Sequence, residues 1–336
     1  MDAVCLFLIV SAASKAFRIV LGWHPQSSDP RQIRLEIDAE KTFIEARWCF
    51  VLWGVSTGIM VAGIADVFPD VVPGAMCGTG VLQSMEGFGR RAILFRLVFS
   101  GVMFLIIEME RLNRSRPDSP LAAGISRLLL LSSPVFFIGV WDTFRAFHRI
   151  DVQAPVSCCA AVYDRFRPLT DAGTASGVPE GYWIIAFGAA TILLLASSAR
   201  VSFVKLGNFR RDAAITAISS MVWVPFAAAS LVRVFSAYYY QVLHHHCPWC
   251  LFLPEHHFAG FALFGLLTVV ALEGPCGYLL LSMIKAAPDL HAAAFRRARK
   301  SGLRILFSTT IFLLLVGLPP IIWRLRFGVW MGGMEF

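Results

Sequence analysis

Two cysteines and five histidines lie close together in this chain, and both residue types can carry redox or metal chemistry. Residues 238–257 read YYYQVLHHHCPWCLFLPEHH, which places Cys247 and Cys250 in C-x-x-C spacing. In a helical turn, residues i and i+3 lie on one face, so these two sulfurs can close a disulfide or bind one metal ion. The stretch therefore predicts a reactive segment built on two thiols.

The histidines of this segment fit a redox site and a metal site equally well. An imidazolium lowers the pKa of a neighbouring thiol, whereas a neutral imidazole is a ligand for zinc or copper. The alternative is a polar collar at the membrane interface. For a metal site, the predicted ligands are His244, His245, His246, Cys247, Cys250, His256 and His257.

Three further cysteines are candidates for the same chemistry. Cys158 and Cys159 are adjacent, so a bridge between them is strained and easily reduced, and the reduced pair is a clamp for thiophilic metals. Cys77 lies among glycines that allow backbone or a partner to approach closely. The catalytic set predicted for thiol exchange is Cys247, Cys250, Cys158, Cys159 and Cys77.

The composition is that of a polytopic membrane protein. Hydrophobic residues make up 57% of the 336 residues and charged residues only 15%, against about 25% charged in a typical soluble domain. The formal charge of +8 is explained by the basic residues that collect in cytoplasmic loops, so no nucleic-acid partner is expected. The expected fold class is all-α, a membrane helical bundle in contact with the lipid bilayer.

Apolar runs predict seven transmembrane helices, each near the roughly 20 residues that a bilayer requires. They lie at about 48–66, 92–109, 125–147, 182–204, 213–237, 258–283 and 304–323. Lys and Arg concentrate in one set of connections, which places loops 67–91, 148–181 and 241–257 on the extracytoplasmic side. All five candidate cysteines lie in these loops. We expect an integral protein of the cell (inner) membrane with its cysteine loops extracytoplasmic.

Residues 1–47 precede these spans. The basic residues Lys15 and Arg18 follow the first apolar run, the reverse of a signal peptide, so cleavage is not expected. Because both cations fall within one span-length window, residues 2–21 are expected to form an interfacial helix rather than an eighth span. Residues 28–47 are expected to form an amphipathic surface helix, and residues 48–336 a single transmembrane domain.

The position of the C-P-W-C segment resembles that in a known class of membrane enzymes. Its spacing and proline resemble the redox motif of glutaredoxin-like proteins. Its place at the outer end of a span, beside a second cysteine-bearing loop, resembles membrane thiol oxidoreductases of the DsbB and vitamin K epoxide reductase type. The resemblance covers four or five residues and implies an active pair at Cys247 and Cys250; the chain has seven predicted spans rather than four.

Charged residues within the predicted spans are further candidates, because such charges usually face protein or water. Arg233, Asp142 and Arg145 lie near the predicted outer surface and could line a quinone or proton pocket. The alternative is that they are paired or snorkelling charges that stabilise helix packing.

The leading function predicted from the sequence is thiol–disulfide redox exchange with a membrane carrier or an extracytoplasmic redox protein. Such a protein is an enzyme of the thiol–disulfide oxidoreductase class. The second hypothesis is a metal-handling protein that passes copper or zinc to an extracytoplasmic metal carrier. The third is a structural accessory subunit. Five outer cysteines leave one thiol unpaired, which favours either a relay or a metal site.

Overall fold

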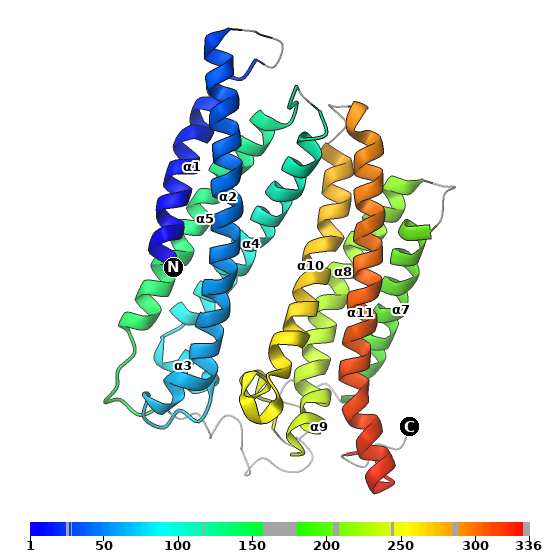
Figure 1. Ribbon diagram of the computed structural model, residues 1–336. Coiled ribbons are helices and arrows are strands. Elements are labelled where there is room, and N and C mark those ends of the chain that lie inside the picture. The colour runs from blue at the N-terminus through cyan, green and yellow to red at the C-terminus, as the bar shows by residue number, and fades with distance from the viewer. Residues whose placement is uncertain are drawn as a thin grey trace. The chain divides into compact units, whose positions relative to one another are not determined.

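The computed structural model describes residues 1–24, 27, 29–116, 118–156, 180–203, 208–242, 245–283 and 288–331. Within these residues, eight helical segments are long and apolar enough to cross a membrane. The long helices are α1 Asp2–Gly22, α2 Pro30–Ala62, α4 Phe88–Asn113, α5 Ala122–His148, α7 Glu180–Phe203, α8 Phe209–Ser230, α10 Ala259–Met283 and α11 His291–Phe327 (Figure 1). The predicted all-α membrane bundle is confirmed, and each of the seven predicted spans overlaps one of these segments.

Short helical elements connect or extend the long helices. Two are π-helical turns, η1 Gly63–Val67 after α2 and η3 Leu231–Phe235 after α8; the latter leads into α9 Ser236–Tyr240. The others are α3 Gly78–Ser84, η2 Phe68–Asp70, η4 Pro248–Phe252, η5 Pro254–His256 and η7 Pro288–Leu290. A π-turn rotates the side chains that follow it relative to a regular helix. The π-turn η3 comes directly before α9, which carries Tyr238, Tyr239 and Tyr240 and leads into the loop with Cys247 and Cys250.

The chain divides into two compact units, which are described separately. Unit 1 comprises Met1–Gly63, Leu82–Asp151 and Met283–Ala294, and contains α1, α2, α4 and α5. Unit 2 comprises Ile64–Val81, Val152–Ser282 and Phe295–Phe336, and contains α7, α8, α10 and most of α11.

Helix α1 packs along α2 in unit 1, and acidic side chains of α2 pair with Lys15 and Arg18 of α1. These two cations were the reason to expect an interfacial helix rather than a membrane span at residues 2–21. Lys15 Nζ lies 2.6 Å from Glu45 Oε1, and an Arg18 nitrogen lies 3.1 Å from an Asp38 carboxylate oxygen. Helix α1 is long and apolar enough to cross a membrane. The paired cations therefore favour the eighth-span alternative over an interfacial helix. The charged residues expected to form a separate surface helix are the first half of the continuous helix α2.

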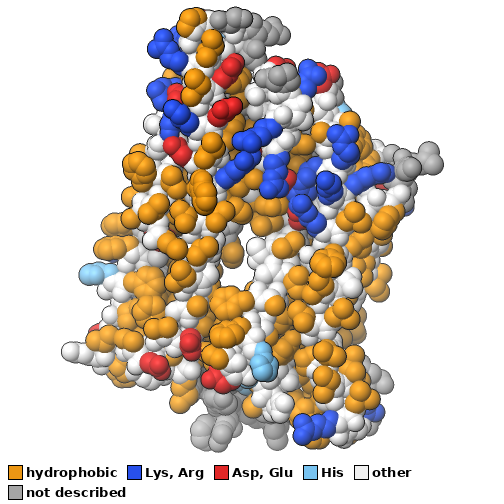
Figure 2. Space-filling view, viewed as in Figure 1, with side chains coloured by type: hydrophobic (Ala, Val, Ile, Leu, Met, Phe, Trp, Pro, Cys, Tyr) orange, Lys and Arg blue, Asp and Glu red, His pale blue; other side chains and the backbone are white. Residues whose placement is uncertain are grey.

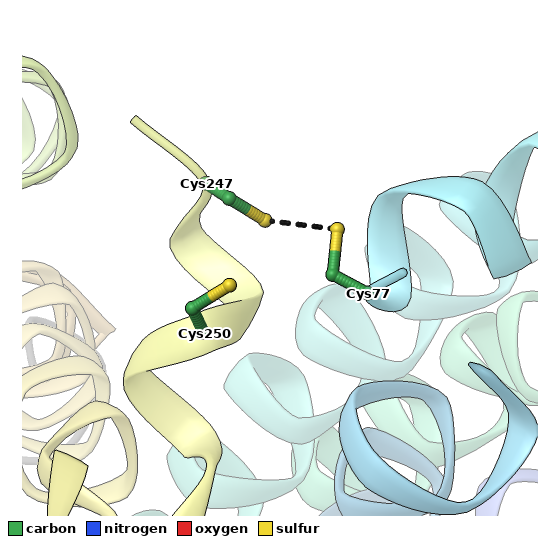
Figure 3. Close-up of side chains that lie close together, drawn as sticks. All are labelled: Cys77, Cys247 and Cys250. Atoms are coloured by element: carbon green, nitrogen blue, oxygen red, sulfur yellow. Dashed lines mark hydrogen bonds between the residues drawn. The ribbon is translucent and has the colours of Figure 1, made fainter. Parts of the chain in front are cut away.

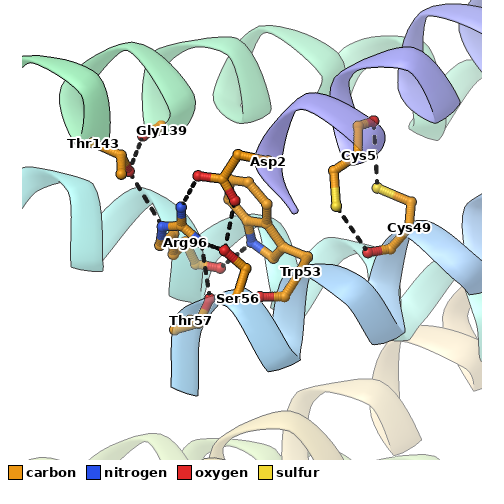
Figure 4. Close-up of polar contacts among 9 residues, drawn as sticks. All are labelled: Asp2, Cys5, Cys49, Trp53, Ser56, Thr57, Arg96, Gly139 and Thr143. Carbon is orange, nitrogen blue, oxygen red and sulfur yellow. Dashed lines mark hydrogen bonds and ion pairs between the residues drawn. The ribbon is translucent and has the colours of Figure 1, made fainter. Parts of the chain in front are cut away.

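The interior of unit 1 holds a buried arginine among aromatic and polar side chains. The Arg96 guanidinium lies 4.2 Å from the Trp53 ring and pairs with the Asp2 carboxylate (Figure 4). It also donates to Thr143 at 3.2 Å, and to the hydroxyls of Ser56 and Thr57. Charges in membrane spans are costly and usually face the protein interior. Here one arginine links residues of α1, α2, α4 and α5.

Aromatic rings form the core of unit 2 and join its four helices. The Phe312 ring of α11 lies 6.2 Å from Phe187 of α7 and 5.2 Å from Trp223 of α8, and Leu263 of α10 belongs to the same buried cluster. The Trp223 indole donates to Thr191 Oγ1 at 2.8 Å. Burial of such large apolar side chains stabilises the fold most strongly.

A buried ionic group also ties α10 to α11 in unit 2. Glu273 is 3% exposed and accepts from Arg297 Nη1 at 2.9 Å, from Ser301 at 2.7 Å and from Arg304 at 2.5 Å. The carboxylate is thus satisfied by two cations and a hydroxyl. This arrangement fits the packing role that the sequence suggested for ionisable residues in spans.

Side chains are distributed along the helices as a bilayer requires. Figure 2 shows apolar side chains along the middle of the helices, with most of the visible Lys, Arg, Asp and Glu toward the helix ends. Many large apolar side chains are exposed, including Ile185, Ile192, Ile218, Phe307 and Leu314. Exposed apolar residues in that number are expected to contact lipid.

Candidate functional site

The C-x-x-C segment forms a short 3₁₀ helix that places both thiols on one side. Cys247 is the extended residue before η4, and Pro248 occupies its first turn, where a missing N–H costs nothing. Residues i and i+3 are eclipsed in a 3₁₀ helix. The Cys250 side chain therefore lies on the side of the turn toward which Cys247 points (Figure 3).

Cys77 reaches the same point from a distant part of the chain. Its carbonyl accepts from the backbone N–H of Gly80 at 3.0 Å as α3 begins. Its thiol lies 3.3 Å from Cys247 Sγ, and the sulfurs of Cys77, Cys247 and Cys250 all lie within 4.8 Å of one another (Figure 3). The three residues are only 4%, 2% and 9% exposed. We call Cys77, Cys247 and Cys250 the thiol cluster.

Gly78 allows the two segments to approach this closely. A Cβ atom on Gly78 would lie 2.6 Å from Cδ2 of the Trp249 ring. Trp249 also contacts Phe252, with ring centroids 6.0 Å apart, so the indole is packed against a second aromatic ring. The absence of a side chain at residue 78 thus permits the packing that brings Cys77 to Cys247.

We expect Gly78→Ala to destabilise the protein by about 1–3 kcal/mol, the typical cost of overpacking. The matched control is Gly188→Ala in α7, where a Cβ meets nothing within 4 Å. Alanine is favoured over glycine in a helix by roughly 0.5–1 kcal/mol, so the control is expected to be neutral or stabilising. Thermal unfolding of both variants in detergent measures the difference. Equal effects would show that the Gly78–Trp249 contact is not tight.

His245 and Tyr240 surround the thiol cluster on one side. His245 Nε2 lies 3.1 Å from Cys250 Sγ, and its ring lies 4.8 Å from that of Tyr240. The Tyr240 hydroxyl donates to the Cys247 carbonyl at 2.5 Å, and Thr79 Oγ1 lies 3.4 Å from Cys247 Sγ. One imidazole and two hydroxyls therefore contact residues of the thiol cluster directly.

The proximity of the thiols shifts the pKa values of Cys247 and Cys250 in opposite directions. Hydrogen bonds from Cys250 and then Cys77 lower the pKa of Cys247, whereas Cys250, which donates to Cys247, has a raised pKa. Burial lowers the pKa of His245, so its imidazole is neutral at pH 7. The reduced cluster therefore holds one stabilised thiolate, at Cys247, beside the thiol of Cys250.

We expect the reduced, metal-free protein to retain a thiolate at pH 6. A free cysteine with a pKa near 8.5 is almost fully protonated there, whereas a lowered pKa keeps Cys247 ionised until the pH falls through that lower value. Cys250→Ala removes the first hydrogen-bond donor and moves the transition to higher pH. Thiolate ultraviolet absorbance titrated from pH 4 to 10 follows this change. If wild type and variant both first gained absorbance near pH 8.5, the hydrogen bonds would be too weak to matter.

In the described part of the chain, none of the other predicted ligands joins the three sulfurs of the thiol cluster. Cys158, Cys159 and His244 lie outside the described residues. Within the described residues, Cys77, Cys247 and Cys250 are the one group of three metal-ligating side chains that meets at a point. His246 and His257 are therefore not among these converging ligands. His256 contacts Tyr240, with ring centroids 4.7 Å apart.

The three candidates for a quinone or proton pocket have neighbours within their own units. Asp142 accepts from Arg91 Nη2 at 2.6 Å, and the Arg145 guanidinium lies over the Phe88 ring at 4.8 Å; both belong to unit 1. The Arg233 guanidinium of unit 2 lies 4.9 Å from the Trp183 ring. These contacts fit the packing alternative for each residue.

The supporting residues Tyr240 and Thr79 were not assigned a role from the sequence, whereas the glycines beside Cys77 were expected to allow a close approach, as Gly78 does for Trp249. Their signals were the tyrosine run before the histidines and the Gly78-Thr79-Gly80 segment after Cys77. Their roles depend on the meeting of two segments distant in sequence. None of the six described cysteines is part of a disulfide: Cys5, Cys49, Cys77, Cys247, Cys250 and Cys276.

Comparison with protein-family models, curated proteins and solved structures gives no match. The function must therefore be argued from the chemistry of the thiol cluster.

Proposed function

We propose that this membrane protein binds a soft metal ion, Cu(I) or an ion of similar chemistry, through the thiol cluster. The observation that carries the proposal is the convergence of three sulfurs within 4.8 Å of one another, from segments 170 residues apart in sequence. Thiolates are the ligands that select Cu(I), zinc and iron–sulfur clusters among metal groups. A structural disulfide would require two cysteines, not three.

The number of ligands favours Cu(I) over zinc. A structural Zn²⁺ site is almost always four-coordinate. Three sulfurs meet here, whereas His245 contacts Cys250 and does not belong to the mutually close group. We infer that three thiolates bind the ion and that His245 hydrogen-bonds to the sulfur of Cys250. Such outer contacts orient the ligand and tune the affinity.

Burial of the thiol cluster suits an ion that must be kept from water and oxygen. The three cysteines belong to the same apolar core cluster as Phe187, Trp223 and Leu263. This surrounding limits access by solvent and hard ligands such as water. The protein would thus hold or pass on the ion at one end of its apolar helices.

The second candidate is the thiol–disulfide relay predicted from the sequence. It is favoured by one observation: Cys247 Sγ is 3.3 Å from Cys77 Sγ and is also close to Cys250. In this reaction two cluster thiols lose two electrons and two protons to the disulfide of a partner protein, which is reduced to two thiols. Cys247 would then exchange its bond between Cys77 and Cys250.

Metal titration and disulfide mapping distinguish the two functions. The detergent-purified, reduced protein is titrated anaerobically with Cu(I) in competition with a coloured Cu(I) chelator, and in parallel with Zn²⁺. The proposal predicts about one Cu(I) per chain, held more tightly than Zn²⁺, with all three cluster thiols protected from alkylation. Failure to compete for Cu(I), together with a cluster disulfide after exposure to an oxidised partner, would favour the relay.

A further inference from the structure

A cavity of about 580 Å³ lies in unit 2, between α9, η5, the first turns of α10 and the last turns of α11. It is separate from the thiol cluster and shares none of its cysteines. Its wall includes His256, whose ring contacts Tyr240, so the cavity borders the segment that carries the cluster. A cavity of this size admits a ligand of substantial volume.

One part of the cavity is apolar and follows a membrane-spanning helix. Leu315, Leu318 and Ile322 lie along one stripe of α11 at spacings of three and four residues. Leu318 and Ile322 are 55% and 53% exposed, so this stripe is open to the bilayer. A hydrocarbon chain that lies against it stays within the apolar region of the membrane.

The other part of the cavity presents hydrogen-bond donors at the helix end. The Trp323 indole Nε1 is buried and has no hydrogen-bond partner among the described residues. Arg326, three residues further along α11, contacts the Phe327 ring at 5.3 Å and forms no ion pair within the described part of the chain. An indole N–H and a guanidinium are both suitable donors to a phosphate.

An acidic side chain, Glu255, lines the same cavity, so the lining carries a negative charge as well as the positive charge of Arg326. Glu255 is exposed and forms no salt bridge with a described residue. The rings of Tyr238 and Tyr239 also line the cavity. A carboxylate and aromatic faces both attract an ammonium group. Among the described residues of the lining, Arg326 is the one Arg or Lys and Glu255 the one carboxylate, and this pair matches a zwitterionic headgroup better than an anionic one.

We propose that this cavity is a binding site for a phospholipid with an aminoethyl phosphate headgroup, of the phosphatidylethanolamine type. Its phosphate accepts hydrogen bonds from Arg326 and Trp323, its ammonium pairs with Glu255, and one acyl chain lies along Leu315, Leu318 and Ile322. The site is independent of the metal function.

Native mass spectrometry of the full-length protein tests the site with three lipids of identical acyl chains. The probes are phosphatidylethanolamine, phosphatidylglycerol and phosphatidylcholine, each titrated into delipidated protein in detergent. Phosphatidylethanolamine is expected to bind most tightly. Arg326→Gln is expected to weaken phosphatidylethanolamine and phosphatidylglycerol alike, about fivefold, since one basic contact with the lipid surface is lost.

Two more variants assign the remaining groups. Glu255→Gln is expected to weaken phosphatidylethanolamine and leave phosphatidylglycerol unchanged, and Trp323→Phe removes the N–H while keeping the ring. The matched control is Arg324→Gln in the same turn of α11. Arg324 is outside the cavity lining, where it donates to the Gly328 carbonyl and contacts Trp330. Equal affinity for the three lipids, or equal effects of the two arginine variants, would overturn the proposal.

Discussion

Replacement of Cys247 with serine is expected to abolish Cu(I) binding by the reduced protein. The sulfur of Cys247 lies 3.3 Å from Cys77 Sγ and within 4.8 Å of Cys250 Sγ. Cys247 is 2% exposed, and its lowered pKa makes it ionise more readily than Cys250. A serine hydroxyl is a hard and weak ligand for a soft ion. We expect the affinity to fall by more than roughly 100-fold, beyond the 10–100-fold cost of removing an outer contact. Cys77→Ser and Cys250→Ser should have comparable effects.

Competition with a coloured Cu(I) chelator measures each affinity, and Cys276→Ser provides the control. Cys276 is also a buried cysteine of unit 2 without a disulfide, at 2% exposure, but it lies within α10 and outside the thiol cluster. Its variant should bind Cu(I) as the unmodified protein does. Unchanged affinity in all three cluster variants would mean that the ion binds elsewhere.

Arg96→Met is expected to be among the most destabilising single substitutions in unit 1. Arg96 is 1% exposed and pairs with the Asp2 carboxylate. It also donates hydrogen bonds to the hydroxyls of Ser56, Thr57 and Thr143. Methionine fills much of the volume but leaves a carboxylate and three hydroxyls without this donor. Breaking a buried ion pair by removing one partner typically costs about 3–5 kcal/mol. We expect the thermal midpoint in detergent to fall by roughly 5–10 °C, given about 2 °C per kcal/mol in a large chain.

Two further variants test whether the loss of stability comes from the buried charge of Arg96 or from removal of any positive charge. Arg18→Met removes an exposed partner of Asp38 and should cost at most about 1 kcal/mol, as surface pairs do. Asp2→Asn in the Arg96→Met background removes the unpaired carboxylate and should restore part of the lost stability. If Arg18→Met and Arg96→Met lowered the midpoint equally, the buried network would not stabilise unit 1 as described.

The helices could be predicted from the sequence because each span carries its own signal. A run of about twenty apolar residues identifies a span regardless of its neighbours. The N-terminal segment was harder, since Lys15 and Arg18 interrupt it. Their partners Glu45 and Asp38 lie in the next helix, and no local pattern reveals that the charges are paired.

The thiol cluster could be predicted only in part. The C-x-x-C spacing identified Cys247 and Cys250 as a pair, and the loop positions placed Cys77 on the same side of the membrane. That Cys77 is the third member depends on a contact across 170 residues of sequence. The selection of His245 from the run of histidines likewise depends on how the loop folds back against Tyr240.

Copper K-edge X-ray absorption of the Cu(I)-loaded protein tests the central claim most directly. The signal reports the type and number of atoms bound to the metal, and thus whether the thiol cluster acts as one ligand set. We predict three sulfur ligands in the unmodified protein and a loss of sulfur scattering when Cys77 is replaced with serine. A first shell dominated by nitrogen or oxygen, or three-sulfur coordination that persists in the Cys77 variant, would contradict metal binding by these three cysteines.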